Sequence, residues 1–338
     1  MKKLLAVVAV SCLYPYFAIA ENTITINDEI DIGFGGFIRA DLGVGDRYGK
    51  AHDDDRLGVS KAAFAVTTSY KNIQGVFVLG SEVTSVNNST EDGNIDIKDA
   101  FVIMKFSPVD LIVGAQPLLF GLKPQGYPGD HSIQGSVEYG AGGAFAISNQ
   151  AGPAVVANWN ITDSFSLRGG FFDHNDYQNS GTRAASDPLV DNGSGIFDNL
   201  FIQLSGKNIL GTGIYANTGI EKRYVGDSVD DSENIFVLGA GWKNAQLDFS
   251  AEYQALDKTF IGTAHDENYF ILESSYMPNS DYRVYLDYSA ADELDLTTWR
   301  LGGNYHYNKH TMFTVEYARD DADSDDVDSV DARVTLSF

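Results

Sequence analysis

Histidine and serine are the side chains in this sequence that could carry out hydrolytic chemistry. Six histidines are available as bases, and HNDYQNSG at 174–181 sets a histidine, an aspartate and a serine close together. Such proximity carries little weight, because catalytic triads assemble in space. Neither a nucleophile elbow nor a metal-ligand pair stands out. We therefore expect a protein that is not an enzyme and binds no cofactor, and His306 is the one histidine worth testing.

Two runs of carboxylates could bind a hard cation such as calcium. They are HDDD at 52–55 and DDADSDDVDSVD at 320–331, and alternating carboxylates are ligands for such ions. Both runs lack the glycine and terminal glutamate spacing of an EF-hand loop. Their composition favours solvated loops that attract divalent cations without a defined site. No metal-binding residue is predicted.

The first twenty residues, MKKLLAVVAVSCLYPYFAIA, have the layout of a secretory signal peptide. Lys2 and Lys3 precede a short apolar stretch, and Ala18-Ile19-Ala20 is a small-residue triplet of the kind that precedes a cleavage site. A lipoprotein signal acylated at Cys12 is the alternative, on a loose match in the residues before it. We expect residues 1–20 to be removed, and with them the one cysteine of the sequence.

The remaining segment, residues 21–338, is strongly acidic and is expected to form one domain. It keeps 21 of the 23 basic residues and all 47 acidic residues, so its net charge is 21 − 47 = −26. This charge argues against nucleic acid or an anionic lipid surface as a partner. No stretch in it reaches the roughly 18 to 20 consecutive apolar residues that a membrane-spanning helix needs. The segment is therefore either soluble or crosses a membrane as a β-barrel.

Apolar and polar residues alternate with a period of two down the chain, which indicates strands with two unlike faces. The connections between these strands alternate between two kinds. Seven are short turns: 71–72, 107–110, 162–164, 206–208, 243–244, 278–280 and 308–310. Eight are longer and polar or acidic: 45–56, 87–94, 119–152, 174–195, 221–233, 258–266, 290–296 and 319–327. Fifteen connections join sixteen strands, with fourteen or eighteen as the alternatives.

Short turns alternating with long loops are typical of a transmembrane up-and-down β-barrel. A soluble β-sandwich, the alternative, has no reason to sort its connections by length and is rarely this long. The count treats 119–152 as one long third loop, although GSVEYGAGGAFAISNQAG at 135–152 could hold another strand pair. Aromatic residues near the turns suit the girdles at the two membrane interfaces. The predicted fold class is all-β, a sixteen-stranded antiparallel transmembrane barrel.

The passage DAFVIMKFSPVDLIVGAQPLLFGL at 99–122 resembles part of the phosphate-selective porins and their relatives. Gly114, Gln116, Phe120 and Gly121 match that group's G-Q-x-x-x-x-F-G motif. Resemblance to these Gram-negative outer-membrane porins implies passive diffusion of small hydrophilic solutes through a water-filled lumen. It also implies a homotrimer, and a third loop that folds inward to narrow the pore. The phosphate-selective members have a ladder of lumenal arginines and lysines, for which this chain has too few basic residues, so phosphate selectivity is not inferred.

The polar side chains that alternate with the apolar ones would line the lumen, where both signs of charge occur. We predict a constriction in which basic residues of the wall face acidic residues of the third loop and create an electric field across the pore. The plainer alternative is that each of these groups is only a solvated lumenal side chain. The net charge predicts a mild preference for cations. The basic residues of the wall are Arg39, Lys61, Lys105, Arg168, Arg300 and Arg333, and the acidic residues of the third loop are Asp130 and Glu138.

A substrate-specific sugar channel is the alternative function. It would need a file of lumenal aromatic residues, for which Tyr127 and Tyr139 of the third loop and inward-facing Phe101 and Tyr285 are the candidates. Under either function, the expected surroundings are outer-membrane lipid and lipopolysaccharide, whose phosphates divalent cations can bridge to the acidic loops.

The chain ends on VDARVTLSF, residues 330–338, in which Ala332, Val334, Leu336 and Phe338 would face lipid. In a closed barrel this last strand pairs with the first one, at about residues 30–44, and leaves no free edge. Phe338 would then lie in the periplasmic aromatic girdle. The resemblance implies that a terminal aromatic residue is also recognised during barrel assembly.

Overall fold

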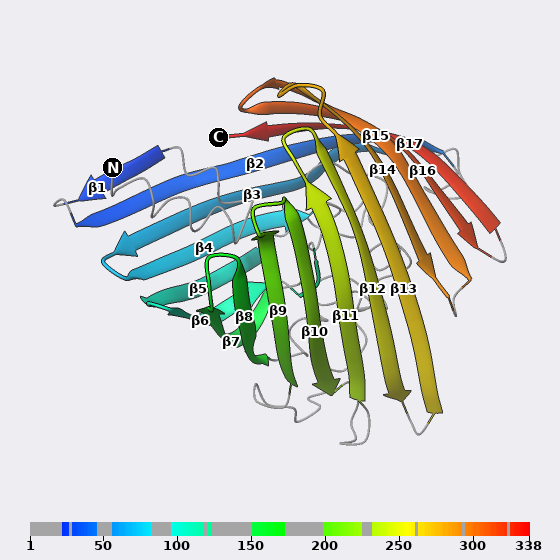
Figure 1. Cartoon of the computed structure of the whole chain (residues 1–338). Coiled ribbons are helices and arrows are strands. Elements are labelled where there is room, and N and C mark those ends of the chain that lie inside the picture. Colours follow the sequence, from blue (N-terminus) through cyan, green and yellow to red (C-terminus); the bar gives the residue numbers. More distant parts are fainter. Residues whose placement is uncertain are drawn as a thin grey trace, which may run out of the picture.

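The computed structural model describes residues 22–26, 29–45, 56–82, 96–117, 120–122, 151–172, 199–224, 232–260, 263–292, 295–322 and 325–338. These ranges form one antiparallel β-sheet that is rolled into a barrel (Figure 1). Its strands are β1 (Asn22–Ile26), β2 (Ile30–Gly45), β3 (Arg56–Tyr70), β4 (Ile73–Glu82), β5 (Asp96–Phe106), β6 (Val109–Pro117), β7 (Ala151–Asn160), β8 (Phe165–Phe172), β9 (Asn199–Ile209), β10 (Ile214–Tyr224), β11 (Ser232–Lys243), β12 (Leu247–Phe260), β13 (Thr263–Tyr276), β14 (Tyr282–Ala291), β15 (Leu296–Asn308), β16 (Thr311–Ala322) and β17 (Asp325–Ser337).

The sixteen strands from β2 to β17 close the barrel. Each pairs antiparallel with its neighbours in the chain, and β17 pairs with β2 to complete the circle. The predicted sixteen-strand barrel and its closure between the last strand and residues 30–44 are therefore confirmed. β6 pairs directly with β7, so one connection, residues 118–150, joins them.

The period of two places apolar side chains on the outside. On β9, Leu200, Ile202 and Leu204 are exposed, whereas Phe201 and Gln203 are buried on the inner side. The same division holds along β14, β15, β16 and β17. An outer surface of this kind is what a barrel presents to lipid. In the described ranges, no helix is long and apolar enough to span a membrane.

The sequence analysis did not predict the short additional strand β1. It pairs with the first residues of β2, from Asn22 opposite Phe34 to Ile26 opposite Ile30. On the same edge of β2, the last strand ends where the backbone of Phe338 exchanges two hydrogen bonds with Gly36, both 3.0 Å. Because both strands run antiparallel to β2, β1 continues the line of β17 beyond the end of the chain.

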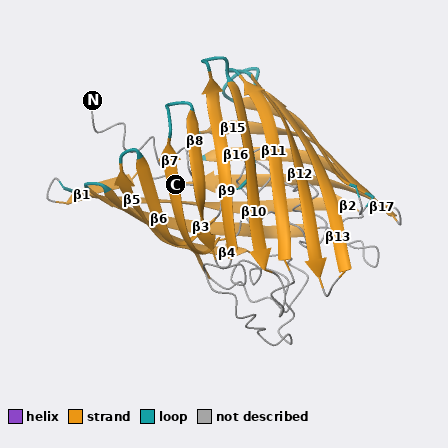
Figure 2. Ribbon diagram, turned by 60° about the horizontal axis from the view of Figure 1, so that its bottom comes forward, coloured by secondary structure: helices purple, strands orange, loops and turns teal. Residues whose placement is uncertain are grey.

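Three of the connections predicted as long loops are short, which corrects the sorting by length. Residues 258–266, 290–296 and 319–327 were expected to be loops, yet only 261–262, 292–295 and 323–324 separate the strands there. The error has a physical cause, because polar residues interrupt the apolar alternation at these strand ends while the backbone pairing continues. The turns that were predicted to be short lie at the other end of the barrel from these connections, and Figure 2 shows them there in teal.

The turn predicted at 206–208 also lies elsewhere. β9 continues to Ile209, and the chain turns at 210–213. Gly211 and Gly213 have φ angles of +73° and +81°, which are conformations that glycine adopts at least cost. A Cβ at Gly213 would also overlap the carbonyl oxygen of Lys243. Glycine is therefore placed where this turn requires it.

Two tyrosines on the inner face each tie three neighbouring strands together. Tyr285 of β14 lies over Gly302 of β15, and its hydroxyl donates to Glu316 Oε2 of β16 at 2.7 Å. Tyr215 of β10 lies over Gly241 of β11 and donates to a carboxylate of β12. The ring takes the space that a Cβ on the glycine would fill, and an aromatic ring over a strand glycine is a known way of fixing strand register.

Candidate functional site

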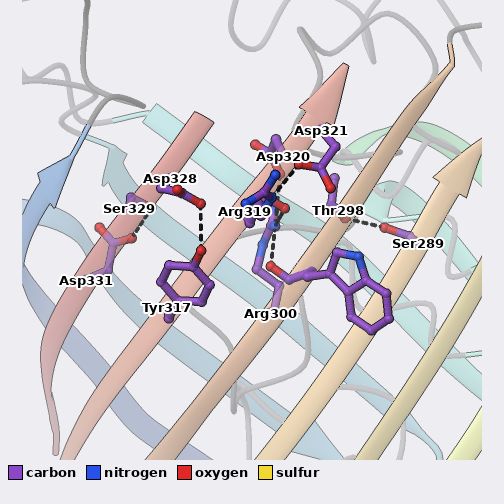
Figure 3. A network of polar contacts seen from close by, with 11 residues as sticks. Ser289, Thr298, Arg300, Tyr317, Arg319, Asp320, Asp321, Asp328, Ser329 and Asp331 are labelled. Atoms are coloured by element: carbon purple, nitrogen blue, oxygen red, sulfur yellow. Dashed lines mark hydrogen bonds and ion pairs between the residues drawn. The ribbon is translucent and has the colours of Figure 1, made fainter. Parts of the chain in front are cut away.

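Polar and charged side chains line the inner face of β12–β17 and β2. They are hydrogen-bonded to each other, as in the pair Ser289–Thr298 at 2.6 Å and the bond from Asn304 Nδ2 to Thr314 Oγ1 at 2.9 Å. Arg300 forms an ion pair of 2.9 Å with Asp320 (Figure 3). The buried members of this polar wall are Arg39, Asp41, Ser250, Glu252, Gln254, Glu267, Asp287, Ser289, Thr298, Arg300, Asn304, Thr314, Glu316, Ser329, Asp331 and Thr335.

The polar wall includes an ion pair across the seam of the barrel. Arg333 of β17 and Asp41 of β2 are opposite each other in the strand register. Arg333 Nε donates to Asp41 Oδ1 and Nη2 donates to Oδ2, each at 2.7 Å. Two parallel bonds between guanidinium and carboxylate fix geometry as well as charge. This pair joins the first and last strands of the barrel.

The opposite part of the inner face is apolar, which the sequence prediction of a polar, mixed-charge wall did not include. Strands β4–β7 carry apolar residues on both faces, in runs such as VFVLG and LIVG, so alternation gives no signal there. The buried residues of this apolar wall are Val76, Val78, Phe101, Ile103, Ile112, Ala154, Val156, Phe172, Phe201, Ile235 and Val237.

The third connection begins inside the barrel. Its described residues 120–122, which we call the root, contact inward-facing groups of β9–β12. The Phe120 ring meets the Phe201 ring edge-on, with centroids 6.2 Å apart. Gly121 exchanges two hydrogen bonds with the Gln203 side chain, of 2.9 and 3.3 Å. The Leu122 N–H donates to Glu252 Oε2.

The root lies away from the wall because the chain is too short to follow the wall from β6 to β12. Pro117 ends β6, and five residues later Leu122 is bonded to β12, six strands further round. Six strand spacings along the wall are about 29 Å. Five residues of extended chain span at most about 18 Å. Residues 120–122 therefore lie in the interior of the barrel and not along its wall.

Comparisons with solved structures agree with this geometry. The loop L8 deletion mutant of OmpT, an outer membrane protein of Vibrio cholerae, has a TM-score of 0.66 and 14% identity, and the match covers 92% of this chain and 100% of that one. The anion-selective porin from Comamonas acidovorans also has a TM-score of 0.66 and 14% identity, with 92% of this chain and 100% of that one covered. The outer membrane channel DcaP of Acinetobacter baumannii has a TM-score of 0.63 and 13% identity, and the match covers 93% of this chain and 99% of that one. The chain has the fold of the outer-membrane porins.

Similarity at this level is one of fold. No protein-family model matches the sequence, and no curated protein sequence is significantly similar to it. What the porin fold of this chain does must therefore be argued from its own residues.

The predicted basic residues of the wall lie in two separate places of the porin fold. Arg39 and Arg333 are on the neighbouring strands β2 and β17, and Arg300 is on β15. Arg168 is on β8 beside the apolar wall, with its guanidinium 5.7 Å from the Phe201 ring centre. Lys105 is half-buried at the end of β5 and lies opposite Asp110. The backbone of Lys61 lies opposite that of Arg39 in the strand register. The two acidic candidates, Asp130 and Glu138, lie outside the described residues.

The four residues of the porin-like motif lie in β6 and the root that follows it. Gly114 has a φ of +129°, and a Cβ there would lie 2.7 Å from Phe101 Cα. Gln116 is fully buried and donates to the Ile112 carbonyl at 3.4 Å. Phe120 is buried in the interior, and Gly121 has a φ of +101°. Sequence reasoning found this motif but missed its partner Gln203, because nothing local to β9 marks that glutamine.

The acidic run at 320–331 forms part of β16 and β17 and is not a loop, which corrects the prediction. On the outer face, Arg319 Nε pairs with Asp321 (Figure 3). Arg319 Nη2 pairs with Asp326 Oδ2 at 2.8 Å. The Tyr317 hydroxyl donates to Asp328 at 2.6 Å. Across the described ranges, no group of three or more potential ligands could hold a metal ion. The run at 52–55 lies outside those ranges.

Proposed function

We propose that this chain is an outer-membrane porin that lets small hydrophilic solutes and ions diffuse passively through its barrel. The observation that carries the proposal is a closed sixteen-strand barrel with an apolar outer face, a charged inner wall and a third connection that starts across the interior. A barrel with this division of faces is stable in lipid and holds polar side chains inside. The homotrimer, the signal peptide at 1–20 and the surrounding lipopolysaccharide belong to the same proposal.

The constriction in this proposal lies where the third connection, 119–152, narrows the lumen. Its root supports the arrangement, since residues 120–122 already lie against β9–β12. The basic residues of the wall would then face Asp130 and Glu138 of this connection. Opposed charges at a narrow point would order water and hinder apolar solutes.

Mild cation preference is the proposed selectivity. Among the described buried residues, seven carboxylates stand against three arginines: Asp41, Glu221, Glu252, Glu267, Asp287, Glu316 and Asp331 against Arg39, Arg168 and Arg300. An excess of negative charge around a narrow aqueous path favours cations. The two described candidates for a sugar-guiding aromatic file support that alternative less, because Phe101 packs in the apolar wall and Tyr285 is bonded to Glu316.

Swelling of liposomes in sugars of graded size tests this function. We expect liposomes containing the folded protein to swell at rates that fall smoothly with sugar size, because a general channel selects by diameter. Liposomes without protein and liposomes with the unfolded chain are the controls. One sugar that enters far faster than its size predicts would favour the substrate-specific channel. Absence of swelling in the smallest sugar would contradict a channel of either kind.

A further inference from the structure

The root of the third connection is held by two side chains that are themselves fixed. The Gln203 amide bonds both the N–H and the carbonyl of Gly121, as a neighbouring strand would, and its Nε2 also donates to Ser205 Oγ at 2.9 Å. Glu252 accepts the Leu122 N–H through Oε2, and its Oε1 accepts from Gln254 Nε2 at 2.6 Å. Both side chains are buried on the inner face. Neither is part of the porin-like motif.

The wall beneath the root has a shape that fits it. A Cβ at Gly219 of β10 would lie 2.7 Å from the Phe120 ring. A Cβ at Gly239 of β11 would lie 3.0 Å from Leu122 Cβ. Two neighbouring strands therefore have glycine, with no side chain, at the points where Phe120 and Leu122 contact the inner face. Hydrogen bonds on either side and apolar contacts between them form one seat.

We propose that Gln203 and Glu252 are positioning residues that hold the root across the lumen and so fix the cross-section open to solutes. The inference rests on the proposed channel function and deepens it. Among the described residues the root pairs with no strand, and these two side chains bond its backbone groups. In a water-filled lumen, water can replace them, and each lost bond shifts the balance toward the released root by about five-fold.

The test records single channels in planar bilayers and uses a reversible cross-link. Gln203→Ala removes two bonds to Gly121 and is expected to raise the variance of the open-channel current by at least about five-fold, as the root samples released positions. Leu122→Cys with Gly239→Cys supplies a bridge at the seat, because their Cβ atoms need to separate only slightly to reach disulfide range. In the Gln203→Ala background, oxidation of this pair is expected to restore the wild-type variance, and reduction to abolish the rescue. A variance equal to wild type in Gln203→Ala, or no rescue on oxidation, would overturn the inference.

Two further variants separate position from charge. Glu252→Ala is expected to increase the variance, whereas Glu252→Gln keeps an acceptor for Leu122 and is expected to behave as wild type in this respect. Ser274→Ala removes a bond to the Leu286 carbonyl on the outer face and is the matched control. Equal variances for Glu252→Gln and Glu252→Ala would contradict a positioning role for that carboxylate.

Cross-linking rates keep the inference testable if the protein does not conduct. The bridge is expected to form more slowly in Gln203→Ala than in the wild-type background, because the root is away from its seat for part of the time. A silent wild-type channel with this slower rate would contradict the proposed function and leave the seat supported. Equal rates would contradict the seat itself. In the wild-type background, oxidation is expected to leave conductance unchanged, and a changed conductance would overturn the inference even if Gln203→Ala fails to fold.

Discussion

Deletion of Phe338 is expected to lower the yield of folded, membrane-inserted barrel by about five-fold or more, without changing the conductance of the molecules that do fold. The last residue exchanges two backbone hydrogen bonds with Gly36. Loss of two such bonds at the closing edge shifts a folding equilibrium by at least that factor. The Phe338 ring also lies over Gly36, where a Cβ would come within 2.7 Å of it. Heat-modifiable mobility on gels measures the folded fraction.

The matched control for this deletion is Phe338→Tyr, which keeps the backbone bonds and an aromatic ring. It is expected to fold at close to the wild-type yield. A normal yield from the truncated chain would contradict the role given to the seam. A full loss in Phe338→Tyr would also contradict it, since every contact that the account uses is retained.

Replacement of Arg333 by alanine is expected to destabilise the barrel by about 2–4 kcal/mol, because it leaves Asp41 buried without its bidentate partner. The pair joins β17 to β2, so its loss weakens the closure that all other strands depend on. Unfolding by guanidinium in lipid vesicles, followed by tryptophan fluorescence, measures the change.

An exposed ion pair elsewhere on the barrel provides the comparison. Arg319→Ala breaks the pairs with Asp321 and Asp326 on the outer face and is expected to leave stability unchanged within error. The charge swap Arg333→Asp with Asp41→Arg is expected to recover part of the loss. Equal effects of Arg333→Ala and Arg319→Ala would contradict a special contribution of the seam pair.

The barrel was predictable from the sequence because its information is local. Alternation within single strands, such as Val284, Leu286 and Tyr288 against Tyr285 and Asp287, gives both the strands and their two faces. Strand number followed from the order of connections, even where their lengths were misjudged. The seam followed from the requirement that the two end strands pair.

The details that concern function depend on residues far apart in the sequence. Gly121 meets Gln203, and Leu122 meets Glu252, 130 positions further on. No local sequence pattern indicates that Gln203 or Glu252 would be the partner. β1 is similar, since NTITI is too short to be recognised from its own residues and pairs with the first residues of β2.

The single measurement closest to the central claim is the current carried by the purified, folded barrel in a planar bilayer. The account predicts stepwise conductance increments that grow in proportion to KCl concentration, as a water-filled path requires. It also predicts a reversal potential of cation-selective sign in a KCl gradient, from the excess of lumenal carboxylates. A chloride-selective sign would contradict the proposed selectivity. A correctly folded barrel that inserts without any conductance step would contradict the channel itself.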